Sequence, residues 1–360
     1  MKIDILPKNP HDLYTTPLLQ QTAYWSEVKS KLGFIPLAFE IEVREKDLHP
    51  SLSSSARIRD DILILYRKIN KEEAVCYSPY GPLLSPDEEI MGDFIESLSE
   101  GLREVLPKDV ILIRFDLPWF DERDDMDIKS MEIMMNWGTV NHNIRHSFSD
   151  MLPSNTTFVD LSPSLDEIVM NMKNKTRYNI RLSQKRGVVV REGSEEDLPI
   201  FLSLYKETAQ RNGIRNHSSS SFSSLFHTNE DDAVVKLLIA EREGESLAAL
   251  FLSLSDDRAS YLYGASSTLG REHMPTYALQ MAAIREAKRN GAREYDMFGV
   301  APEGEENHPL SGLSRFKLGF GGKRVKRMGC WDYALKKDEA ERFFLEERGW
   351  QKLSREMISV

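Results

Sequence analysis

The sequence predicts an α/β (α+β) protein built from two related domains. Two observations predict this class: the chain has 360 residues, and a strand–strand–helix–strand order occurs once in each half. Single hydrophobic cores usually stop growing at about 250–300 residues, so a chain of this length is expected to divide. We place the boundary near residue 155, which gives an N-terminal domain of residues 1–155 and a C-terminal domain of residues 156–360. No long heptad segment occurs, so we expect no long coiled-coil arm.

The first half contains the four elements of this order. ILILYRKI (62–69) and EAVCYSPYGPLL (73–84) are rich in branched and aromatic residues, which is typical of strands. The segment 85–106 is predicted to be helical, with Ser85 as its N-cap and a proline in the first turn. VILIRFDLPW (110–119) is a short apolar run that fits a buried strand.

The second half repeats the order. KLLIAERE (236–243) and the segment 247–267 predict three strands that are joined by short polar turns. PTYALQMAAIREAKRN (275–290) predicts a helix that begins at its proline, and Gly291 lies where a C-terminal cap is expected. REYDMFGV (293–300) predicts the strand that follows.

Each half is similar to the core of an N-acetyltransferase-type fold, which predicts two tandem GNAT-like domains. Asp116 and Asp296 fall at equivalent places, near the ends of the strands that follow the two helices. Acyl-CoA users of this fold hold pyrophosphate on backbone N–H groups of a glycine-rich turn before the central helix. Here LLSPDEEI (83–90) brings acidic residues to that turn, and SSTLGREHMPTYAL (266–279) has one glycine and a proline without an N–H group. We therefore expect no CoA cofactor.

Charge is distributed unevenly along the chain. The formal net charge is −10, from 47 Lys and Arg against 57 Asp and Glu, which by itself argues against a nucleic-acid partner. Residues 171–191 nevertheless contain seven Lys or Arg and no acidic residue, and residues 315–327 contain six and none. Such basic segments favour a local anionic ligand such as phosphate or an RNA end, although two solvated helix faces would give the same pattern.

Composition also indicates the compartment. A hydrophobic fraction of 41% allows sizeable cores, and a charged fraction of 29% is typical of a soluble protein. Cys76 and Cys330 are far apart and form no CxxC pattern, which favours a reducing cytoplasm. No window approaches 18 apolar residues, and the first ten residues contain no signal-peptide core. We therefore expect a cytoplasmic protein.

The segment SGLSRFKLGFGG (311–322) has an unusual composition. Lys317 stands between Phe316 and Phe320, and three of the four residues 319–322 are glycine. Glycines let a backbone approach another surface or adopt positive φ. A lysine flanked by aromatic rings is either a surface cation with its stem on apolar groups or a charge held where its field acts. The segment alone leaves both interpretations open.

Seven segments, taken in their order and spacing, resemble the FemABX family of aminoacyltransferases, which add amino acids to peptidoglycan precursors. Each segment is only a few common residues, but together they extend through most of the chain. The resemblance implies twin N-acetyltransferase-like domains and a donor that is aminoacyl-tRNA instead of CoA. The segments are QQTAYWSEVKSKLGF (20–34), YSPYGPLL (77–84), IRFDLPW (113–119), KNKTRYNIRLSQKRGV (173–188), TAQRNG (208–213), YLYGASS (261–267) and GLSRFKLGFGG (312–322).

The resemblance implies that Phe316 and Lys317 form the donor site. Attack of an amine on an aminoacyl ester passes through a tetrahedral oxyanion and expels the ribose hydroxyl. Alignment of the two substrates supplies much of the rate, and a cation beside the oxyanion and the terminal phosphate adds to it. We expect Lys317 to be catalytic, with Phe316 and Phe320 excluding water and Gly319 and its neighbours admitting the acceptor end of the tRNA.

The other site residues are likewise implied by the resemblance. Lys29, with Trp25 one helical turn before it, corresponds to a contact with the phosphates or sugar of the cell-wall precursor. Asp116 corresponds to the acidic residue near the acceptor amine, which takes a proton or orients the ammonium. Arg211 suits bidentate binding of phosphate or carboxylate, and Tyr263 is expected to line the acceptor groove. No aromatic residue closely follows Arg211, which leaves the contact with the peptide stem open.

Structural explanations stay open for these residues: a surface lysine, a turn-capping aspartate, a helix-end arginine and a buried strand tyrosine. Asp296 is assigned a structural role. LGFGGKR lacks the order of a P-loop, and His142 and His146 lack nearby further ligands, so no metal is expected.

The expected partners are aminoacyl-tRNA and a lipid-linked or UDP-linked muropeptide, with peripheral contact at the inner membrane face left open. Two alternatives remain at this point: an N-acyltransferase of the same fold that takes a thioester or CoA donor, and a catalytically idle protein that binds the precursor.

Overall fold

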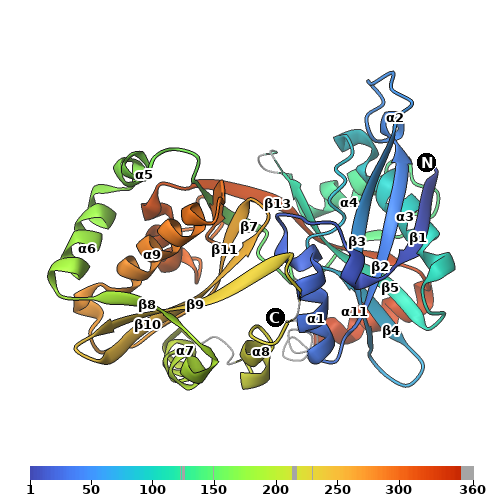
Figure 1. The fold of residues 1–360 in the computed structure, drawn as a ribbon. Helices are drawn as coiled ribbons and strands as arrows, with labels where there is room; N and C mark the ends of the chain where they lie inside the picture. Colours follow the sequence, from blue (N-terminus) through green and yellow to red (C-terminus); the bar gives the residue numbers. More distant parts are fainter. Residues whose placement is uncertain (122, 124–125, 149, 213–216, 229, 350–360) are drawn as a thin grey trace. The chain divides into compact units, whose positions relative to one another are not determined.

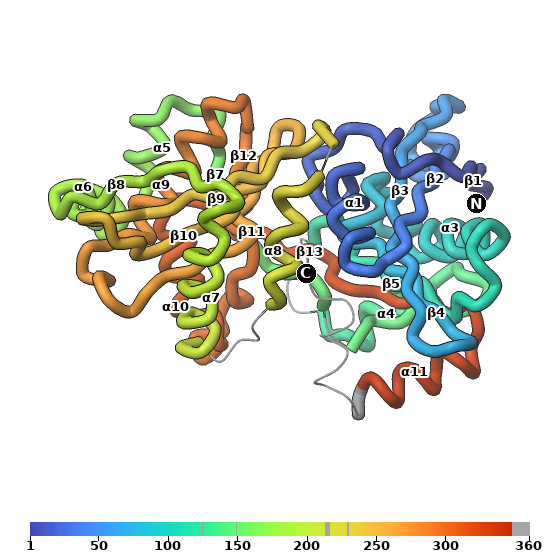
Figure 2. The backbone as a smooth tube through the Cα atoms, turned by 60° about the horizontal axis from the view of Figure 1, so that its bottom comes forward, coloured from blue at the N-terminus to red at the C-terminus, as the bar shows by residue number. Residues whose placement is uncertain are grey.

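The chain forms two compact units in a computed structural model that describes residues 1–121, 123, 126–148, 150–212, 217–228 and 230–349. Unit 1 comprises Met1–Tyr14, Gln20–Ser154 and the described residues from Lys326 onward, and unit 2 comprises Thr15–Leu19 and Asn155–Val325. In each unit, helices cover both faces of a sheet (Figure 1, Figure 2).

The strands of unit 1 follow the order β1-β2-β3-β4-β5-β13, with β6 paired to β13. The first four are antiparallel, β5 is parallel to β4, and β13 is antiparallel to β5. The parallel pair requires a crossover, which the helix α3 provides. The strands are β1 Ile3–Lys8, β2 Ile35–Arg44, β3 Arg57–Lys68, β4 Ala74–Ser78, β5 Val110–Phe120, β6 Ile144–His146 and β13 Lys323–Ala334.

Two helices of unit 1 pack on opposite faces of β5, because successive side chains of a strand point to opposite faces. Phe115 and Leu117 lie in the core cluster beneath α3, whereas Leu112 packs with Phe343 of α11. The helices are α1 Ala23–Lys31, α2 Glu45–Leu48, α3 Met91–Val105, α4 Ile128–Asn136 and α11 Lys337–Gly349.

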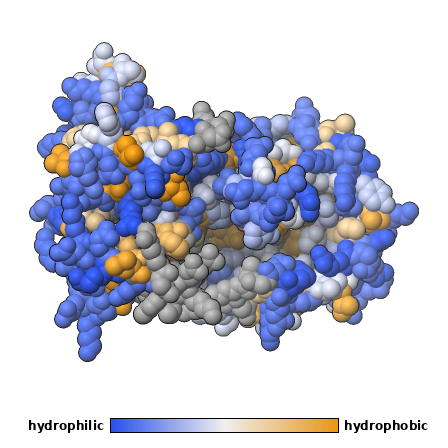
Figure 3. All heavy atoms as spheres, turned by 180° about the vertical axis from the view of Figure 1, so that it is seen from behind, coloured by the Kyte–Doolittle hydropathy of each residue, from blue (hydrophilic) through white to orange (hydrophobic). Residues whose placement is uncertain are grey.

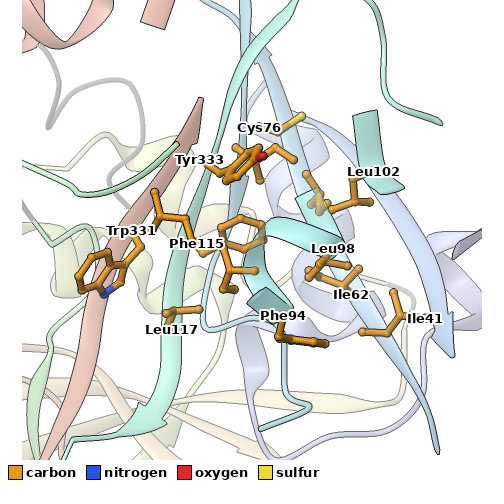
Figure 4. Packing of buried hydrophobic residues seen from close by; sticks show 14 of the residues in the cluster. Ile41, Ile62, Cys76, Phe94, Leu98, Leu102, Phe115, Leu117, Trp331 and Tyr333 are labelled. Atoms are coloured by element: carbon orange, nitrogen blue, oxygen red, sulfur yellow. The ribbon is translucent and has the colours of Figure 1, made fainter. Parts of the chain in front are cut away.

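The C-terminal strand β13 supplies part of the unit 1 core. Trp331 and Tyr333 are fully buried in one cluster with Phe115 of β5 and Phe94 of α3 (Figure 4). Trp331 lies directly opposite Phe115 in the register of the two strands. The observed division therefore differs from a C-terminal domain of residues 156–360, because the chain returns to unit 1 at Lys326.

Unit 2 has the same plan. Its strands follow the order β8-β9-β10-β11-β12-β7, in which β8 to β11 are antiparallel, β12 is parallel to β11, and β7 is antiparallel to β12. The strands are β7 Asn155–Asp160, β8 Val189–Gly193, β9 Ala233–Arg242, β10 Glu245–Ser255, β11 Arg258–Ser266 and β12 Glu294–Asp296.

The helices of unit 2 also lie on both faces. Leu250 and Leu252 of β10 pack beneath α9, whereas Phe251 between them contacts Phe201 of α7. Ile180 of α6 joins the α9 cluster. The helices are α5 Leu165–Asn171, α6 Asn174–Lys185, α7 Leu198–Asn212, α8 Ser219–Ser223, α9 Pro275–Arg289 and α10 Ser311–Lys317.

The predicted element order is confirmed in both units, including a helix α9 that begins at Pro275 and is followed by Gly291 with φ of 85°. The predicted start of the first-half helix at Ser85 is wrong. The N–H of Asp87 donates to the Leu48 carbonyl, and a 3-10 turn over Glu88–Ile90 precedes α3. The longest helices of the described ranges, α3, α7 and α9, have 15 residues each, so this part of the chain carries no long helical arm.

The surface is mainly hydrophilic on the face that Figure 3 shows. None of the helices in the described ranges combines the length and the apolar character that a membrane crossing requires.

Candidate functional site

Lys317 is the last residue of α10, and only 4% of its surface is exposed. Its Nζ donates to the Gly299 carbonyl at 2.9 Å and lies 5.3 Å from the centroid of the Tyr261 ring. Burial lowers the pKa of Lys317 from 10.5 to about 7, and the charge of Asp296 partly opposes that shift. The side chain is therefore a held amine that exchanges a proton near neutral pH, and the surface-cation interpretation does not apply.

Asp296 ends β12 and is buried beside this amine. Its carboxylate accepts hydrogen bonds from the Phe298 N–H at 2.8 Å and from the Thr156 hydroxyl of β7. Phe298 has φ of 57°, an uncommon value for a non-glycine residue. Gly299, whose carbonyl holds Lys317, directly follows this turn.

The electrostatic interaction with Lys317 gives Asp296 more than the structural role that its sequence position predicts, and neither Tyr261 nor Gly299 is among the predicted site residues. The sequence does contain a signal that Asp296 belongs to the site. Asp296 lies near the end of the strand after the second helix, the position that Asp116 has in the first half. A backbone carbonyl such as that of Gly299 has no side-chain signal at all.

The two phenylalanines beside Lys317 anchor its segment to α9. Phe316 and Phe320 contact each other with ring centroids 5.2 Å apart, and both contact Tyr277 of α9. The ring that faces the ammonium is instead that of Tyr261. We expected the rings of Phe316 and Phe320 to confine the Lys317 side chain, but the ring beside its amine is that of Tyr261 in β11.

The glycines after Lys317 let the segment approach other parts of unit 2. A Cβ at Gly319 would collide with Oγ1 of Thr176, and the Gly319 carbonyl accepts from the Lys173 N–H at 2.9 Å. Gly321 has φ of 84°, and a Cβ there would lie 2.8 Å from the Asn171 carbonyl oxygen. These close approaches are intramolecular, whereas the sequence analysis assigned the glycines to an approaching tRNA.

Arg211 contacts Ser266, the last residue of β11, and Tyr263 lies three residues before the end of the same strand. Arg211 is half-buried and donates to both the carbonyl and the hydroxyl of Ser266, at 2.9 and 3.0 Å. Burial, followed by repulsion from Arg271, lowers the pKa of Arg211. The Tyr263 ring packs 5.0 Å from that of Phe222.

A β-bulge separates these two residues from Lys317. Phe251 pairs with Tyr263 and Leu252 pairs with Tyr261, so Leu262 is the extra residue of β11. Tyr261 consequently packs on the α9 side, with Lys317, and Tyr263 packs on the α7 side. The structure brings Lys317 together with Tyr261 and Asp296, and not with Arg211 or Tyr263.

In unit 1, Lys29 and Trp25 are brought together on α1 as predicted, and both are 1% exposed. The Lys29 Nζ lies 5.0 Å from the Trp25 ring centroid and 5.4 Å from that of Phe34. Neither this Nζ nor the Trp25 Nε1 has a hydrogen-bond partner among the described residues. Burial, followed by the charge of Arg67, lowers the pKa of Lys29 to about 7. Lys29 is therefore a buried amine whose N–H donors have no partner among the described residues, and not a surface lysine.

Asp116 lies on β5 in unit 1, and 1% of its surface is exposed. Its carboxylate accepts from the Tyr77 hydroxyl and from the Leu152 N–H at 3.2 Å. Burial raises the pKa of Asp116 from 3.8 to about 7, although the Tyr77 hydrogen bond opposes the rise. Asp116 is therefore a protonatable carboxyl near neutral pH, and it lies in a different unit from Lys317.

A buried ion network that the sequence analysis missed lies two residues from Asp116. Arg114 donates to both Asp332 oxygens at 2.6 and 2.8 Å, and to both Glu347 oxygens at 2.7 and 2.8 Å. All three side chains are buried. The network ties β13 and α11 to β5 and so supports the strand that carries Asp116.

The described residues contain no group of three or more His, Cys, Asp or Glu that is arranged to hold a metal ion. Cys76 and Cys330 are both buried free thiols. The site residues whose pKa burial shifts to about 7 are thus an amine in each unit, Lys29 and Lys317, and the carboxyl of Asp116 in unit 1.

Comparison with known proteins gives one family. The model of the FemAB family matches residues 11–245 and 238–341. A lipid II:glycine glycyltransferase of Staphylococcus epidermidis is 22% identical over 244 residues, which cover 51% of this chain and 59% of that protein. One of Staphylococcus aureus is 21% identical over 249 residues, with the same coverage. The chain thus matches 59% of the length of these curated relatives.

Among solved structures, the crystal structure of FemX superposes with a TM-score of 0.73 at 17% sequence identity. The superposition covers 95% of this chain and 100% of that one, so the two share a fold over that part of this chain.

Proposed function

Because this chain belongs to the FemAB family, we propose that it transfers an amino acid from aminoacyl-tRNA to the amine of a peptidoglycan-precursor peptide. The curated relatives are named lipid II:glycine glycyltransferase, which supports aminoacyl transfer in cross-bridge synthesis. The observation that carries the proposal is the buried Lys317 amine, held by Gly299 and Tyr261 with a pKa near 7.

Lys317 has the properties that the proposed step needs. The acceptor amine attacks the ester carbonyl carbon, an oxyanion forms, and the bond to the ribose oxygen then breaks while that oxygen takes up a proton. Gly299 is the single hydrogen-bond acceptor of Lys317 among the described residues, which leaves further N–H donors for the oxyanion and the leaving oxygen. In surroundings of low dielectric constant such a charge acts strongly. A pKa near 7 also suits proton donation to the leaving oxygen.

Neighbouring residues hold Lys317 ready for this role. The charge of Asp296 favours the protonated amine against the cost of burial. Phe316 and Gly319, which flank Lys317, seat its segment against α9 and α6. We assign these neighbours to positioning the amine at the donor ester.

The acceptor side is assigned to the remaining residues. Lys29 and Trp25 suit the phosphates or sugar of the precursor, because two buried donors without partners gain acceptors from a ligand. Asp116 is assigned to the acceptor amine, where it takes the proton or orients the ammonium. Arg211 and Tyr263 are assigned to the precursor peptide and its carboxylates.

The test is transfer of a labelled amino acid from aminoacyl-tRNA to a lipid-linked and to a UDP-linked precursor, with acetyl-CoA as the competing donor. We expect product from aminoacyl-tRNA and none from acetyl-CoA. Lys317→Ala is expected to lower kcat at least about 10²-fold, the usual effect of one electrostatic contact in an active site. Lys323→Ala, which removes an exposed lysine at the first position of β13, is the matched control with unchanged kcat.

The pH profile gives a second readout. With donor and precursor both saturating, so that binding by Lys29 does not limit the rate, the kcat of the wild type is expected to fall as pH rises above about 7, because the Lys317 ammonium then loses its proton. Lys317→Arg keeps a charge that does not titrate in this range, so its residual activity should lack this alkaline limb. Transfer from acetyl-CoA alone, or an unchanged kcat in Lys317→Ala, would contradict the proposal.

A further inference from the structure

One side of α6 carries a row of cations without partners. Lys175, Arg181 and Lys185 are exposed, and the side chain of none of them has a hydrogen bond or ion pair with any described residue. With Tyr178 they recur at spacings of three and four residues, which places them on one side of a helix. We call Lys175, Tyr178, Arg181 and Lys185 the basic ridge.

The residues on the other side of α6 pack against the rest of unit 2. Packing therefore does not explain why cations line the exposed side. Thr176, Asn179, Ile180 and Ser183 are buried, with Ile180 in the α9 core cluster. Tyr178, in the middle of the ridge, is 62% exposed. An exposed aromatic ring between cations is a pattern typical of surfaces that bind the backbone and sugars of nucleic acids.

The ridge begins at the segment that carries Lys317. The Lys173 N–H, one residue before α6, donates to the Gly319 carbonyl at 2.9 Å, and Thr176 lies against Gly319. From Lys175 to Lys185 the helix rises about 15 Å, so the ridge leads away from Lys317 over that distance. Both ribbon and tube views show α6 at the periphery of unit 2 (Figure 1, Figure 2).

We propose that the basic ridge binds the phosphates of the RNA strand that carries the aminoacyl ester, leading from the ester at Lys317 toward the paired stem. This inference rests on the proposed function and adds where on the chain the RNA lies. One strand of a nucleic acid has a phosphate about every 3 Å of axis, so the ridge is long enough for several. Tyr178 offers its hydroxyl to a ribose 2′-OH or its ring to a sugar, as in other sequence-independent contacts with RNA.

Charge and continuity favour RNA over an anionic membrane as the partner. The chain as a whole has a net charge of −10, so the row of unpaired cations on α6 does not simply reflect an overall positive charge. The backbone hydrogen bond between Lys173 and Gly319 makes the ridge continuous with the proposed ester site. Contacts to phosphate position a nucleic acid without reading its sequence, which suits a donor that is recognised mainly by its end.

The experiment combines Lys175→Gln, Arg181→Gln and Lys185→Gln in the full chain. We expect the KM for aminoacyl-tRNA to rise at least about tenfold at low salt, with kcat at saturating donor unchanged. The slope of log KM against log salt should fall by about 2, because up to three phosphate contacts are lost. A short donor, the aminoacyl ester of the terminal adenosine, should keep its KM, since it does not reach the ridge.

A matched control removes the same charge elsewhere. Lys46→Gln, Lys129→Gln and Lys206→Gln change three exposed lysines on α2, α4 and α7 and should leave the KM for aminoacyl-tRNA unchanged. Far-UV circular dichroism and thermal unfolding check that both triple variants are folded.

The outcomes separate this inference from the proposed function. If the wild type transfers from aminoacyl-tRNA and the ridge variant keeps its KM and salt slope, the inference is overturned and the proposed function stands. If the variant instead loses binding only to vesicles of phosphatidylglycerol and phosphatidylcholine, the ridge is a membrane surface and the inference is again overturned. If the wild type transfers nothing from aminoacyl-tRNA, both fall together.

Discussion

At the scale of single residues, burial is the common feature of the candidate site. Lys29 and Lys317 have pKa values lowered to about 7, and Asp116 has one raised to about 7. In each case burial is the largest cause, because removal from water disfavours the charged form. Groups of this kind concentrate at functional sites, which fits their selection from the resemblance.

Asp116→Asn tests this burial through the pH dependence of stability. The pKa of Asp116 is about 7 in the folded state and about 4 when unfolded, so between these values the native protein binds a proton that the unfolded chain lacks. The stability of the wild type should therefore fall as pH rises from about 4 to about 7, by at most roughly 4 kcal/mol. Asn does not titrate and still accepts the Tyr77 and Leu152 hydrogen bonds.

The measurement is urea unfolding of both proteins at pH 5 and pH 8. The variant should gain stability relative to the wild type at the higher pH. Asp166→Asn, a change at an exposed position in the first turn of α5, is the control that should show no such trend. Parallel pH curves for Asp116→Asn and the wild type would show that Asp116 does not titrate near 7.

At the scale of elements, the turn after α10 decides where Lys317 lies. Phe316 and Phe320 pack on Tyr277 of α9, while Gly319 and Gly321 fit against α6 and the end of α5. The segment is thus seated against three helices, and the end of α10 that carries Lys317 is fixed with it. The glycine cluster is explained by packing inside unit 2 before any ligand is considered.

Gly321→Ala and Gly312→Ala form a matched pair that tests this seating. Gly321 has φ of 84° and no space for a Cβ, so alanine there should destabilise unit 2 by about 2 kcal/mol. Gly312 lies in α10 with open space around it, so alanine should stabilise by up to about 1 kcal/mol. Denaturant unfolding measures both. Equal stabilities would mean that the turn after Lys317 is not held in the left-handed conformation.

At the scale of the whole molecule, the chain leaves unit 1 at Ser154 and returns to it at Lys326. The returning strand β13 brings Trp331 and Tyr333 into the unit 1 core, and Arg114 pairs with Asp332 and with Glu347 of α11. Unit 1 is therefore made from both ends of the chain, and its stability depends on residues far apart in the sequence.

A fusion of residues 1–154 to residues 326–360 through a short Gly/Ser linker should fold, whereas residues 1–155 alone should not. The Arg327 N–H donates to the Ser154 carbonyl at 2.7 Å, so a short linker can join the two ends. Without β13 the fragment keeps the β4 pairing of β5 but leaves the other edge of β5 unpaired, and Arg114 is buried without its carboxylates, which costs several kcal/mol. Far-UV circular dichroism and urea unfolding compare the two. A cooperative transition in the shorter fragment would contradict the role given to β13.

Much of the architecture was predictable because it rests on local signals. The start of α9 at Pro275 and the glycine after it follow from residues that suit only these positions of a helix. The proximity of Trp25 and Lys29 follows from their spacing on one helix. The predicted helix start at Ser85 is wrong for a non-local reason. The Asp87 N–H, which an N-cap at Ser85 would have satisfied, donates instead to the carbonyl of Leu48.

The sequence by itself determined the element order and the family resemblance, and it selected Lys317 as a candidate, because periodicity, turn residues and short motifs are properties of neighbouring positions. Only the tertiary structure decided that Asp296 and Tyr261 lie beside Lys317. It also decided that a β-bulge in β11 turns Tyr263 to the other face of the sheet, and that β13 completes the sheet of unit 1. These are contacts between positions distant in sequence. They depend on strand register and burial, which become definite when the chain packs.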